Sequence, residues 1–342
     1  MSRTVPTPPA TGGAVPEPPA PLEDAATPTP PAVVGPAPTV EPSGPAPHRR
    51  RGRVAALVVA LRPRQWVKNL LVYAVPLAAG KLGDRDVVAD TTVAFLCFCA
   101  VASATYLLND VRDVEADRAH PRKRLRPIAA GELSSRAAVV WAVLLAGAGL
   151  LGAALSTYPG FLVTLAVYLI ATLAYSYGLK HEPVIELAVI AAGFVLRAIA
   201  GGTATGIPMS PWFLTVAAFG SLFMAAGKRY SEYVQLGEEG RAARPALARY
   251  TATYLRFVWS LAAAIVLTAY CLWAFQLSVR DRGAVPLAAW SVVPFILAVL
   301  RFALDVDRGD AGAPEDIALG DRVLQVIAVV WLVMFALGSA GI

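Results

Sequence analysis

One amide and three carboxylate side chains cluster at the end of an apolar run that is long enough to cross a membrane. Asn109, Asp113 and Asp117 are spaced four apart, so on a helix they would share one face, with Asp110 on the adjoining ridge. Carboxylates this close repel one another unless a cation lies between them. Proteins usually hold a hard cation such as Mg²⁺ with one or two carboxylates and the phosphates of a substrate. The spacing therefore predicts a metal and polyphosphate site at a membrane surface; the simpler interpretation is a solvated helix end.

Basic side chains follow the acidic cluster directly. They are Arg118, Arg122, Lys123, Arg124 and Arg126. Guanidinium and ammonium groups bind phosphate through charge-assisted hydrogen bonds. The segment is therefore a candidate phosphate-binding loop, although a basic loop between membrane spans is most often only a topology signal.

The composition is that of a membrane protein in two parts. Of the 342 residues, 56% are hydrophobic and only 16% are charged, and the mean hydropathy is +0.56. Residues 1–48 hold 15 of the 27 prolines and no Trp, Tyr or Phe. Such a segment cannot build a core, so it is predicted to be a disordered cytoplasmic tail. Residues 49–342 are predicted to form one membrane domain that holds the catalytic site.

Apolar runs of roughly 17–25 residues, the length that crosses a bilayer, recur from residue 54 onward. Nine such runs cover residues 54–79, 87–108, 137–156, 160–177, 184–204, 212–226, 257–278, 287–304 and 323–340. The sixth is short and the first begins amphipathically. The sequence therefore predicts an all-α polytopic membrane protein with nine transmembrane helices.

The distribution of lysine and arginine predicts the orientation. Four arginines between residues 49 and 53 precede the first run, which favours a cytoplasmic N-terminus. Alternation of nine spans then leaves the C-terminus outside. The segments predicted to lie on the cytoplasmic side are residues 109–136, 178–183, 227–256 and 305–322. We therefore expect a multi-pass protein of the plasma (inner) membrane with a polar cavity that faces the cytoplasm.

Other polar stretches reach that same side. The fourth run ends in the stretch Tyr-Ser-Tyr-Gly-Leu-Lys-His at residues 175–181, and the sixth ends in Lys228 and Arg229. Lys68 and Asn69 are polar residues within the first run. The net charge of +6 and the pI of 9.3 suit anionic lipid head groups and anionic substrates. Nucleic acid is not an expected partner, because the chain has no soluble basic domain.

Arg197 lies inside an apolar stretch of the fifth run. A charged side chain in hydrocarbon is costly unless it faces a polar cavity or a partner. We expect its guanidinium to face the cavity and to pair with Glu186 or with a phosphate; a purely structural ion pair is the alternative. Tyr106 can be read as a site residue or as an anchor at the membrane interface.

Two motifs carry a resemblance to a known family. The pattern Asn109-Asp110-x-x-Asp113-x-x-x-Asp117 resembles the first motif of the UbiA superfamily of intramembrane prenyltransferases, and Tyr175-Ser176-x-x-Leu179-Lys180 resembles its second. Within the superfamily, residues 61–342 are similar to the branch of decaprenyl-phosphate phosphoribosyltransferases. The resemblance implies a UbiA-like helical bundle.

The second motif departs from the superfamily pattern. Members that use prenyl diphosphates usually have a second aspartate-rich motif, approximately DxxxD, whereas residues 180–186 offer only Glu186 near the expected place. This loss fits a site in which the lipid is the acceptor and the pyrophosphate belongs to a soluble sugar donor. Whether one or two Mg²⁺ ions bind is left open.

The resemblance implies Mg²⁺-dependent transfer of a 5-phosphoribosyl group from phosphoribosyl pyrophosphate to decaprenyl phosphate or a related polyprenyl phosphate. The product would feed cell-wall arabinan in arabinogalactan. Asn109 and Asp113 would hold the metal, and Asp110, Asp113 and Asp117 would be the catalytic carboxylates. The candidate substrate-binding residues are Lys68, Asn69, Tyr106, Arg118, Lys123, Arg124, Arg126, Tyr175, Lys180, His181, Glu186, Arg197, Lys228 and Arg229. The division of the basic residues between the donor and the lipid phosphate, the polyprenyl length and the existence of a homo-oligomer stay open.

Three other classes of membrane protein are alternatives to this interpretation. A UbiA-type prenyltransferase that joins a prenyl diphosphate to a small or aromatic acceptor would need a second diphosphate-metal motif. A CDP-alcohol phosphotransferase would show the longer pattern DxxDGxxAR, which is missing. A transporter would spread polar residues over several spans to both faces, whereas here they cluster at one.

Overall fold

The computed structural model describes residues 51–121, 123–237, 240, 245–280, 286–311, 317 and 320–341, and the regular elements of these residues are helices. The predicted tail, residues 1–48, lies outside the described residues, as does Arg122 of the predicted basic loop.

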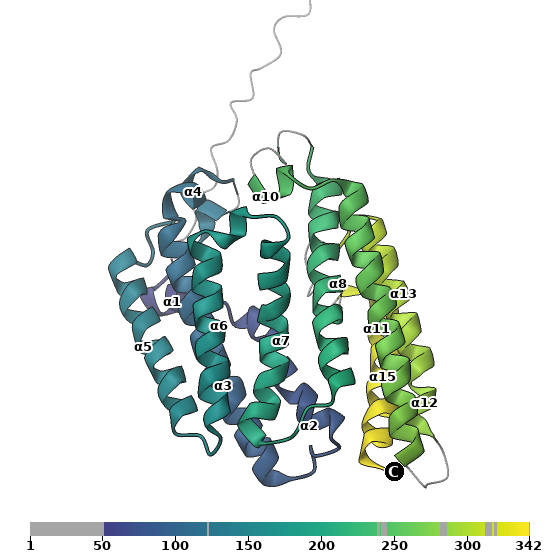
Figure 1. Cartoon of the computed structure of the whole chain (residues 1–342). Helices are drawn as coiled ribbons and strands as arrows, with labels where there is room; N and C mark the ends of the chain where they lie inside the picture. Colours follow the sequence, from purple (N-terminus) through teal and green to yellow (C-terminus); the bar gives the residue numbers. More distant parts are fainter. Residues whose placement is uncertain are drawn as a thin grey trace, which may run out of the picture. The chain divides into compact units, whose positions relative to one another are not determined.

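Long helices run side by side in the membrane domain (Figure 1). Each packs against a neighbour in the chain: α3 with α5, α6 with α7, α7 with α8, α8 with α11, and α13 with α15. Their bounds are α3 (Arg85–Arg112), α5 (Ser135–Ala154), α6 (Pro159–Tyr177), α7 (Ile185–Thr205), α8 (Pro211–Gln235), α11 (Ala252–Arg280), α12 (Leu287–Trp290), α13 (Val292–Asp307) and α15 (Arg322–Ala340).

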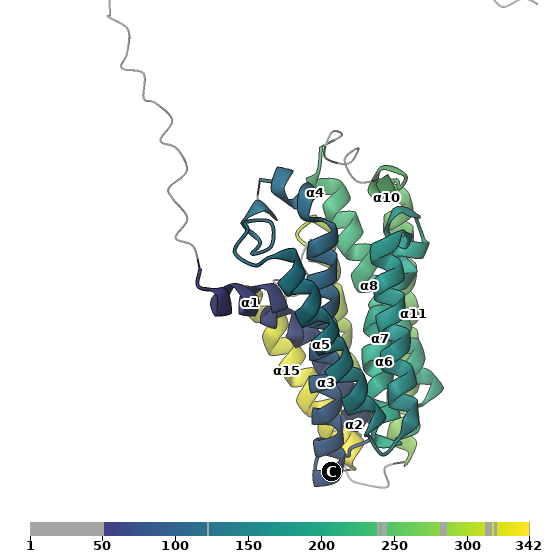
Figure 2. The same ribbon diagram turned by 90° about the vertical axis from the view of Figure 1, so that its left-hand side faces the viewer.

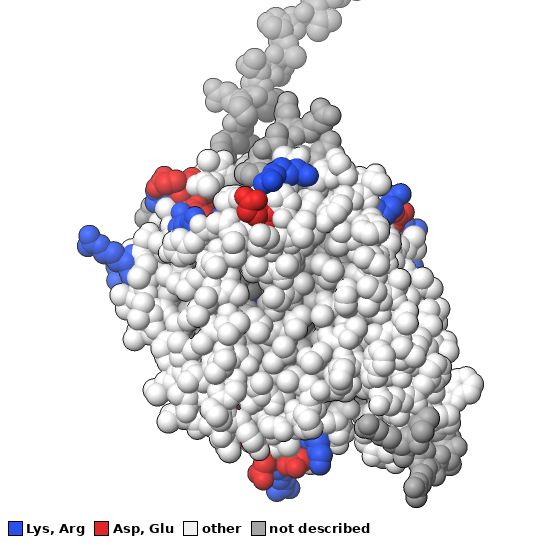
Figure 3. Space-filling model, in the orientation of Figure 1, with Lys and Arg blue, Asp and Glu red and all other residues white. Residues whose placement is uncertain are grey.

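Seven spans in the described part of the chain are long and apolar enough to cross a membrane. They are α3, α5, α6, α7, residues Ala252–Ser278 of α11, the pair α12 and α13, and α15. In the view of Figure 3, charged side chains gather at the two ends and leave an uncharged zone between them. Large apolar side chains such as Val143 and Ile170 are about two-thirds exposed on the outer faces, as expected where lipid replaces water. The prediction of an all-α polytopic membrane protein is confirmed.

The other two of the nine predicted spans differ from these seven. The sixth run lies in α8, which is 25 residues long, contacts α7 and α11, and has a lower hydropathy than the seven. The first run is three elements rather than one helix, namely α1 (Arg53–Leu61), the 3₁₀ helix η1 (Pro63–Tyr73) and α2 (Ala74–Ala78).

A proline explains why the first run is broken. Pro63 lacks an N–H group and disfavours the α conformation at Arg62, which adopts the left-handed region with φ 56° and ψ 60°. In Figure 2, α1 lies across the direction of the long helices. Its Ala56 and Ala60 are buried while Val54 and Val58 are exposed, the pattern of a helix that lies on a membrane surface.

The 3₁₀ geometry of η1 gives its two faces different roles. A 3₁₀ helix has three residues per turn, so side chains three apart lie above one another. Asn69 and Val72 are buried on the face toward the bundle. Lys68 and Leu71 form another face, and each lines one of the two cavities described below. The close approach of η1 to α7 requires Gly201, because a Cβ at this position would overlap the Val72 carbonyl oxygen.

The helix ends bring the predicted polar stretches together. The C-terminal ends of α3, α6 and α8 and the N-terminal end of α7 lie at the end of the bundle that also holds α4 (Val114–Ala119) and α10 (Pro245–Ala248) (Figure 1). The 3₁₀ turns η2 (Lys123–Leu125) and η3 (Leu179–His181) continue from the same helix ends. The predicted convergence of polar segments at one end is therefore present.

Candidate active site

The polar cluster of the first motif divides into two pairs, Asn109 with Asp113 and Asp110 with Asp117. α3 ends at Arg112, and Asp113 has φ −89° and ψ 10° before α4 begins. Asn109 still reaches Asp113, because its Nδ2 donates a hydrogen bond to Asp113 Oδ2 at 3.1 Å. Asp117, on α4, instead accepts from Arg126 at 2.7 Å. The predicted common face holds for Asn109 and Asp113 and is wrong for Asp117, because the helix breaks between them.

Asp110 and Asp117 are tied to arginines. The Asp110 carboxylate is 2% exposed and pairs with Arg62 at 2.5 Å and Arg126 at 3.0 Å. Arg126 also bridges to Asp117. These pairs fasten the ends of α3 and α4 to the junction of α1 and η1. Asp110 and Asp117 are predicted catalytic carboxylates, and Arg126 is a predicted phosphate-binding residue. In the structure Arg126 pairs with both carboxylates, and the roles of the three residues stay predictions.

Asn109 and Asp113 meet the second motif. Ser176 Oγ donates to Asn109 Oδ1 at 3.2 Å, and Lys180 Nζ lies 3.2 Å from Asp113 Oδ1. Arg112 donates to the backbone oxygens of Ser176 and Tyr177 at the C-terminal end of α6, where a cation suits the helix dipole. Motifs more than 60 residues apart in the chain thus form one contiguous group.

The oxygen atoms of Asn109 and Asp113 suit Mg²⁺. Among the described residues no three His, Cys, Asp or Glu side chains form a metal site by themselves. Mg²⁺ does not need one, because it commonly takes one or two carboxylates together with substrate phosphates. The pair therefore fits a metal that binds with a polyphosphate, and Lys180 balances the charge of Asp113 in the structure.

A polar cavity of about 280 Å³ lies beside this pair. Its cationic walls come from Arg62, Lys68 and Arg197, and its described lining contains no Asp or Glu. The other polar lining residues are Thr105, Tyr106, Asn109, Tyr168, Thr172, Tyr175 and Ser176. The Arg62 guanidinium lies over the Tyr106 ring at 4.9 Å. A cavity lined by cations and neutral hydrogen-bonding groups is suited to an anion.

Arg197 is the most informative group of this cavity. It is 6% exposed, and its guanidinium donates to Asn69 Oδ1 at 2.7 Å, to the Tyr168 hydroxyl at 2.8 Å and to the Gly193 carbonyl. All of these acceptors are neutral, and Arg197 makes no ion pair with a described residue. A buried guanidinium without a carboxylate partner leaves its positive charge available to an anionic ligand.

The predicted pairing of Arg197 with Glu186 is wrong. Eleven residues separate them on α7, which is about 16 Å along a helix and too far for a direct contact. Glu186 is fully buried and binds Arg229 through both oxygens, at 2.6 and 2.8 Å. Arg229 also donates to Glu232 at 2.6 Å and to the Tyr175 hydroxyl at 3.2 Å. Glu186 and Arg229, both predicted to bind substrate, instead link α6, α7 and α8.

The remaining predicted residues lie at the edge of the site. Arg118 forms an exposed pair with Glu115. Arg124 and His181 are exposed, while Lys123 and Lys228 are half-buried, and none of the four lines the polar cavity. Sequence reasoning missed Arg62 and Tyr168. The signal for Tyr168 was a hydroxyl in the middle of an apolar run, since a buried tyrosine hydroxyl needs a polar partner.

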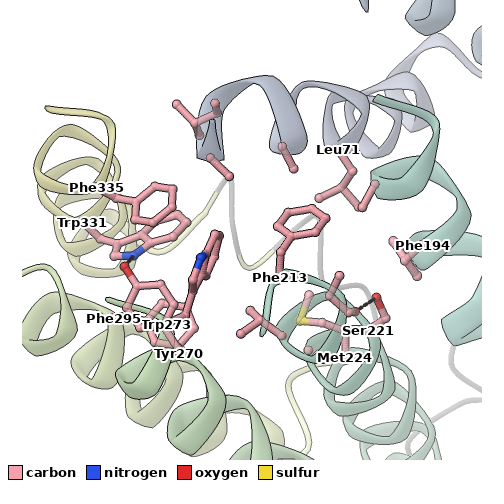
Figure 4. A pocket seen from close by; sticks show the side chains of 17 residues that line it. Leu71, Phe194, Phe213, Ser221, Met224, Tyr270, Trp273, Phe295, Trp331 and Phe335 are labelled. Atoms are coloured by element: carbon pink, nitrogen blue, oxygen red, sulfur yellow. Dashed lines mark hydrogen bonds between the residues drawn. The ribbon is translucent and has the colours of Figure 1, made fainter. Parts of the chain in front are cut away.

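A second cavity, of about 330 Å³, is apolar (Figure 4). Aromatic rings from α8, α11, α13 and α15 line it, among them Phe213, Trp273 and Phe335. Two polar groups of the wall pair with each other, because Trp331 Nε1 donates to the Tyr270 hydroxyl at 2.7 Å. Phe194 lines both cavities. A ligand with an anionic head and a hydrocarbon tail would match the two cavities together.

Comparisons with known proteins show which proteins the chain resembles. The chain matches the UbiA prenyltransferase family over residues 70–319. It is 53% identical over 283 residues to the decaprenyl-phosphate phosphoribosyltransferase of Mycobacterium tuberculosis, which covers 82% of this chain and 92% of the relative. The enzyme of the same name from Corynebacterium glutamicum is 51% identical over 286 residues, covering 81% of this chain and 84% of the relative.

Solved structures share the fold. A UbiA homolog from Archaeoglobus fulgidus bound to GPP and Mg²⁺ gives a TM-score of 0.65 at 18% identity, covering 84% of this chain and 99% of that chain. The homolog bound to DMAPP and Mg²⁺ gives a TM-score of 0.63 at the same identity, covering 84% of this chain and 98% of that chain.

The ion pairs of Asp110 and of Asp113 should contribute differently to the free energy of unfolding. Asp110→Asn leaves Arg62 and Arg126 without their shared carboxylate, and breaking a buried ion pair typically costs about 3–5 kcal/mol. We expect the low end of this range, because both arginines are partly exposed. Asp113→Asn disturbs a more exposed pair and should cost about 1 kcal/mol or less. Unfolding of both variants in detergent micelles checks this, and equal losses would contradict the division into a structural and a functional pair.

Proposed function

The chain belongs to the UbiA prenyltransferase family, and we propose that it transfers a 5-phosphoribosyl group from phosphoribosyl pyrophosphate to decaprenyl phosphate, releasing pyrophosphate. The names of relatives that are about half identical over most of the chain support this activity. In the site itself, the observation that carries the proposal is the buried Arg197 with neutral partners, in a cavity lined by cations beside Asn109 and Asp113.

The donor would occupy the polar cavity. Asn109 and Asp113 would hold Mg²⁺, which neutralises the charge that develops on the leaving pyrophosphate. Lys180 of the second motif, which lies beside Asp113, would help to stabilise the negative charge on the pyrophosphate. Arg197 donates from each of its three nitrogens to a neutral partner, and its two remaining N–H groups would bind a donor phosphate. Lys68 and Arg62 line the cavity as further phosphate contacts.

The chemistry requires positioning rather than a proton acceptor. The bond between the anomeric carbon and the pyrophosphate oxygen breaks, and a phosphate oxygen of the lipid attacks the same carbon from the opposite face. This oxygen is already ionised at neutral pH, so no side chain has to remove a proton. Catalysis then comes from holding the two anions at the right distance and stabilising the leaving charge.

The lipid would use both cavities. Its phosphate would enter the cationic cavity, and the first part of its hydrocarbon chain would pass Phe194 into the apolar cavity. The rest of the polyprenyl chain would extend between helices into the bilayer.

We also propose a cellular location and an orientation in the membrane for the protein. The site would face the cytoplasm of the plasma membrane, the side on which phosphorylated metabolites are found, with the N-terminus on that side. The product would serve the assembly of cell-wall arabinan. A transporter is disfavoured, because the described ion pairs at the ends of α3, α7 and α8 gather at one end of the bundle.

A prenyltransferase that acts on a small acceptor is the second candidate. Its support is the apolar cavity, together with solved relatives bound to a prenyl diphosphate and Mg²⁺. The second motif is evidence against this candidate, because Glu186 forms an ion pair with Arg229 and would not be available to bind a second metal.

Incubation of the purified protein with labelled phosphoribosyl pyrophosphate, decaprenyl phosphate and Mg²⁺ should move the label into the organic phase. Chelation of the metal should abolish this transfer. Asp113→Ala should lower kcat by about 10²–10³, the typical effect of one oriented charge-stabilising contact. No transfer of the label to decaprenyl phosphate, together with prenylation of a small or aromatic acceptor when a prenyl diphosphate is supplied, would favour the second candidate. A folded Asp113→Ala enzyme with normal turnover would remove the metal assignment.

Arg197→Lys should weaken use of the donor although the charge is kept. An ammonium group cannot make the two parallel hydrogen bonds of a guanidinium, so we expect the donor KM to rise by about tenfold and the lipid KM by about twofold or less. Steady-state kinetics with each substrate varied in turn measures both. Arg136→Lys, an exposed arginine of α5, is the matched control. An unchanged donor KM in Arg197→Lys would remove this residue from the donor site.

A further inference from the structure

The segment between the second motif and α7 contains an unusual turn. Val184 has φ 67° and ψ −52°, and the Ile185 N–H donates to the Pro183 carbonyl oxygen at 2.7 Å. This is a γ-turn with positive φ at its central residue, the rarer and more strained of the two forms. Val184 and Arg62 are the two described residues other than glycine with positive φ, and both adjoin the site. A β-branched residue adopts this conformation only where its surroundings hold it.

A tyrosine from another part of the chain holds the turn. The backbone N–H of Val184 donates to the Tyr250 hydroxyl at 2.6 Å. Tyr250 follows α10 and is 4% exposed, so water does not compete freely for this bond. Burial raises the pKa of Tyr250 to about 12, so the hydroxyl remains neutral at physiological pH. The contact therefore joins the segment after α10 to the N-terminal end of α7.

The neighbourhood of Tyr250 makes this contact firm. α10 packs against η3, the turn that carries Lys180. Arg249 pairs with Glu182 at 3.2 Å, one residue before Pro183. The Tyr250 ring stacks on Tyr254, with 5.8 Å between the ring centroids. The hydroxyl is thus presented to the turn from a fixed position.

The turn lies between two groups of the site. Lys180, four residues before Val184, contacts Asp113, and Glu186, two residues after it, binds Arg229. A change in the backbone at Val184 would rotate one of these groups relative to the other. The turn therefore sets where Lys180 stands when Glu186 is locked in place.

We propose that Tyr250 is a positioning residue, whose hydroxyl holds the Val184 turn and thereby keeps Lys180 against Asp113 at the donor site. This inference rests on the proposed function for its kinetic consequence. Its structural consequence, a protected Val184 N–H, does not depend on any substrate.

Tyr250→Phe removes the hydroxyl and keeps the ring. We expect the donor KM to rise by about tenfold, the effect of losing one buried hydrogen bond, while the lipid KM changes by about twofold or less. Tyr254→Phe is the matched control, because this ring stacks on Tyr250 and its hydroxyl makes no hydrogen bond to a described residue. An unchanged donor KM in Tyr250→Phe would overturn the proposal.

Val184→Gly in the Tyr250→Phe background separates positioning from general destabilisation. Glycine adopts positive φ without strain, so the turn no longer depends on the hydroxyl, and the donor KM of the double variant should return to within about threefold of the wild type. A double variant as impaired as Tyr250→Phe alone, with both proteins folded, would contradict a role through the turn.

Hydrogen exchange provides the readout that is independent of the reaction. The backbone amide of Val184 should exchange faster in Tyr250→Phe than in the wild type and in Tyr254→Phe, with no substrate present. If exchange rises but no phosphoribosyl transfer is detected in the wild type, the proposed function fails and the contact stands. If exchange at Val184 is unchanged, the positioning role itself is wrong.

Discussion

A charge inside an apolar bundle must find a partner, and this constraint accounts for most of the polar architecture. Asp110 is balanced by Arg62 and Arg126, and Glu186 by Arg229. Among the residues that the structure describes, Arg197 is the exception, because its hydrogen bonds go to neutral oxygens. The buried charges thus sort into those that hold the helices together and one that is left for a ligand. An anionic substrate would complete the balance.

The broken first run contributes to two kinds of surface. A continuous α-helix would distribute its side chains at 3.6 residues per turn. The 3₁₀ helix η1 instead aligns Lys68 and Leu71 three apart, one toward the polar cavity and one toward the apolar cavity. Asn69, on its buried face, orients the guanidinium of Arg197. One short element therefore contributes to the polar cavity, to the apolar cavity and to the placement of Arg197.

Sequence patterns predicted the helical class, the two motifs and their meeting at one end, because hydrophobic run length and helix-end motifs are local signals. The contact of Asn109 with Asp113 follows from the same local spacing. The position of Asp117 could not be predicted, since no glycine or proline marks the break at Asp113.

The partner of Glu186 depends on how α7 packs against α8, which is a property of tertiary structure. The rise of a helix alone, however, excludes a direct contact with Arg197 eleven residues away. The strained turn at Val184 had no sequence signal beyond the preceding proline, because positive φ at a valine is imposed by its surroundings.

We propose that Asn109 and Asp113 bind the metal with the donor's pyrophosphate, whereas Asp110 and Asp117 are structural partners of arginines. A crystal structure of the protein with phosphoribosyl pyrophosphate and Mn²⁺, with the metal located by its anomalous scattering, tests it most directly. We predict a metal peak within coordination distance of Asn109 and Asp113, with a donor phosphate on Arg197. A metal between Asp110 and Asp117, or a donor whose phosphates do not contact Arg197, would contradict this account.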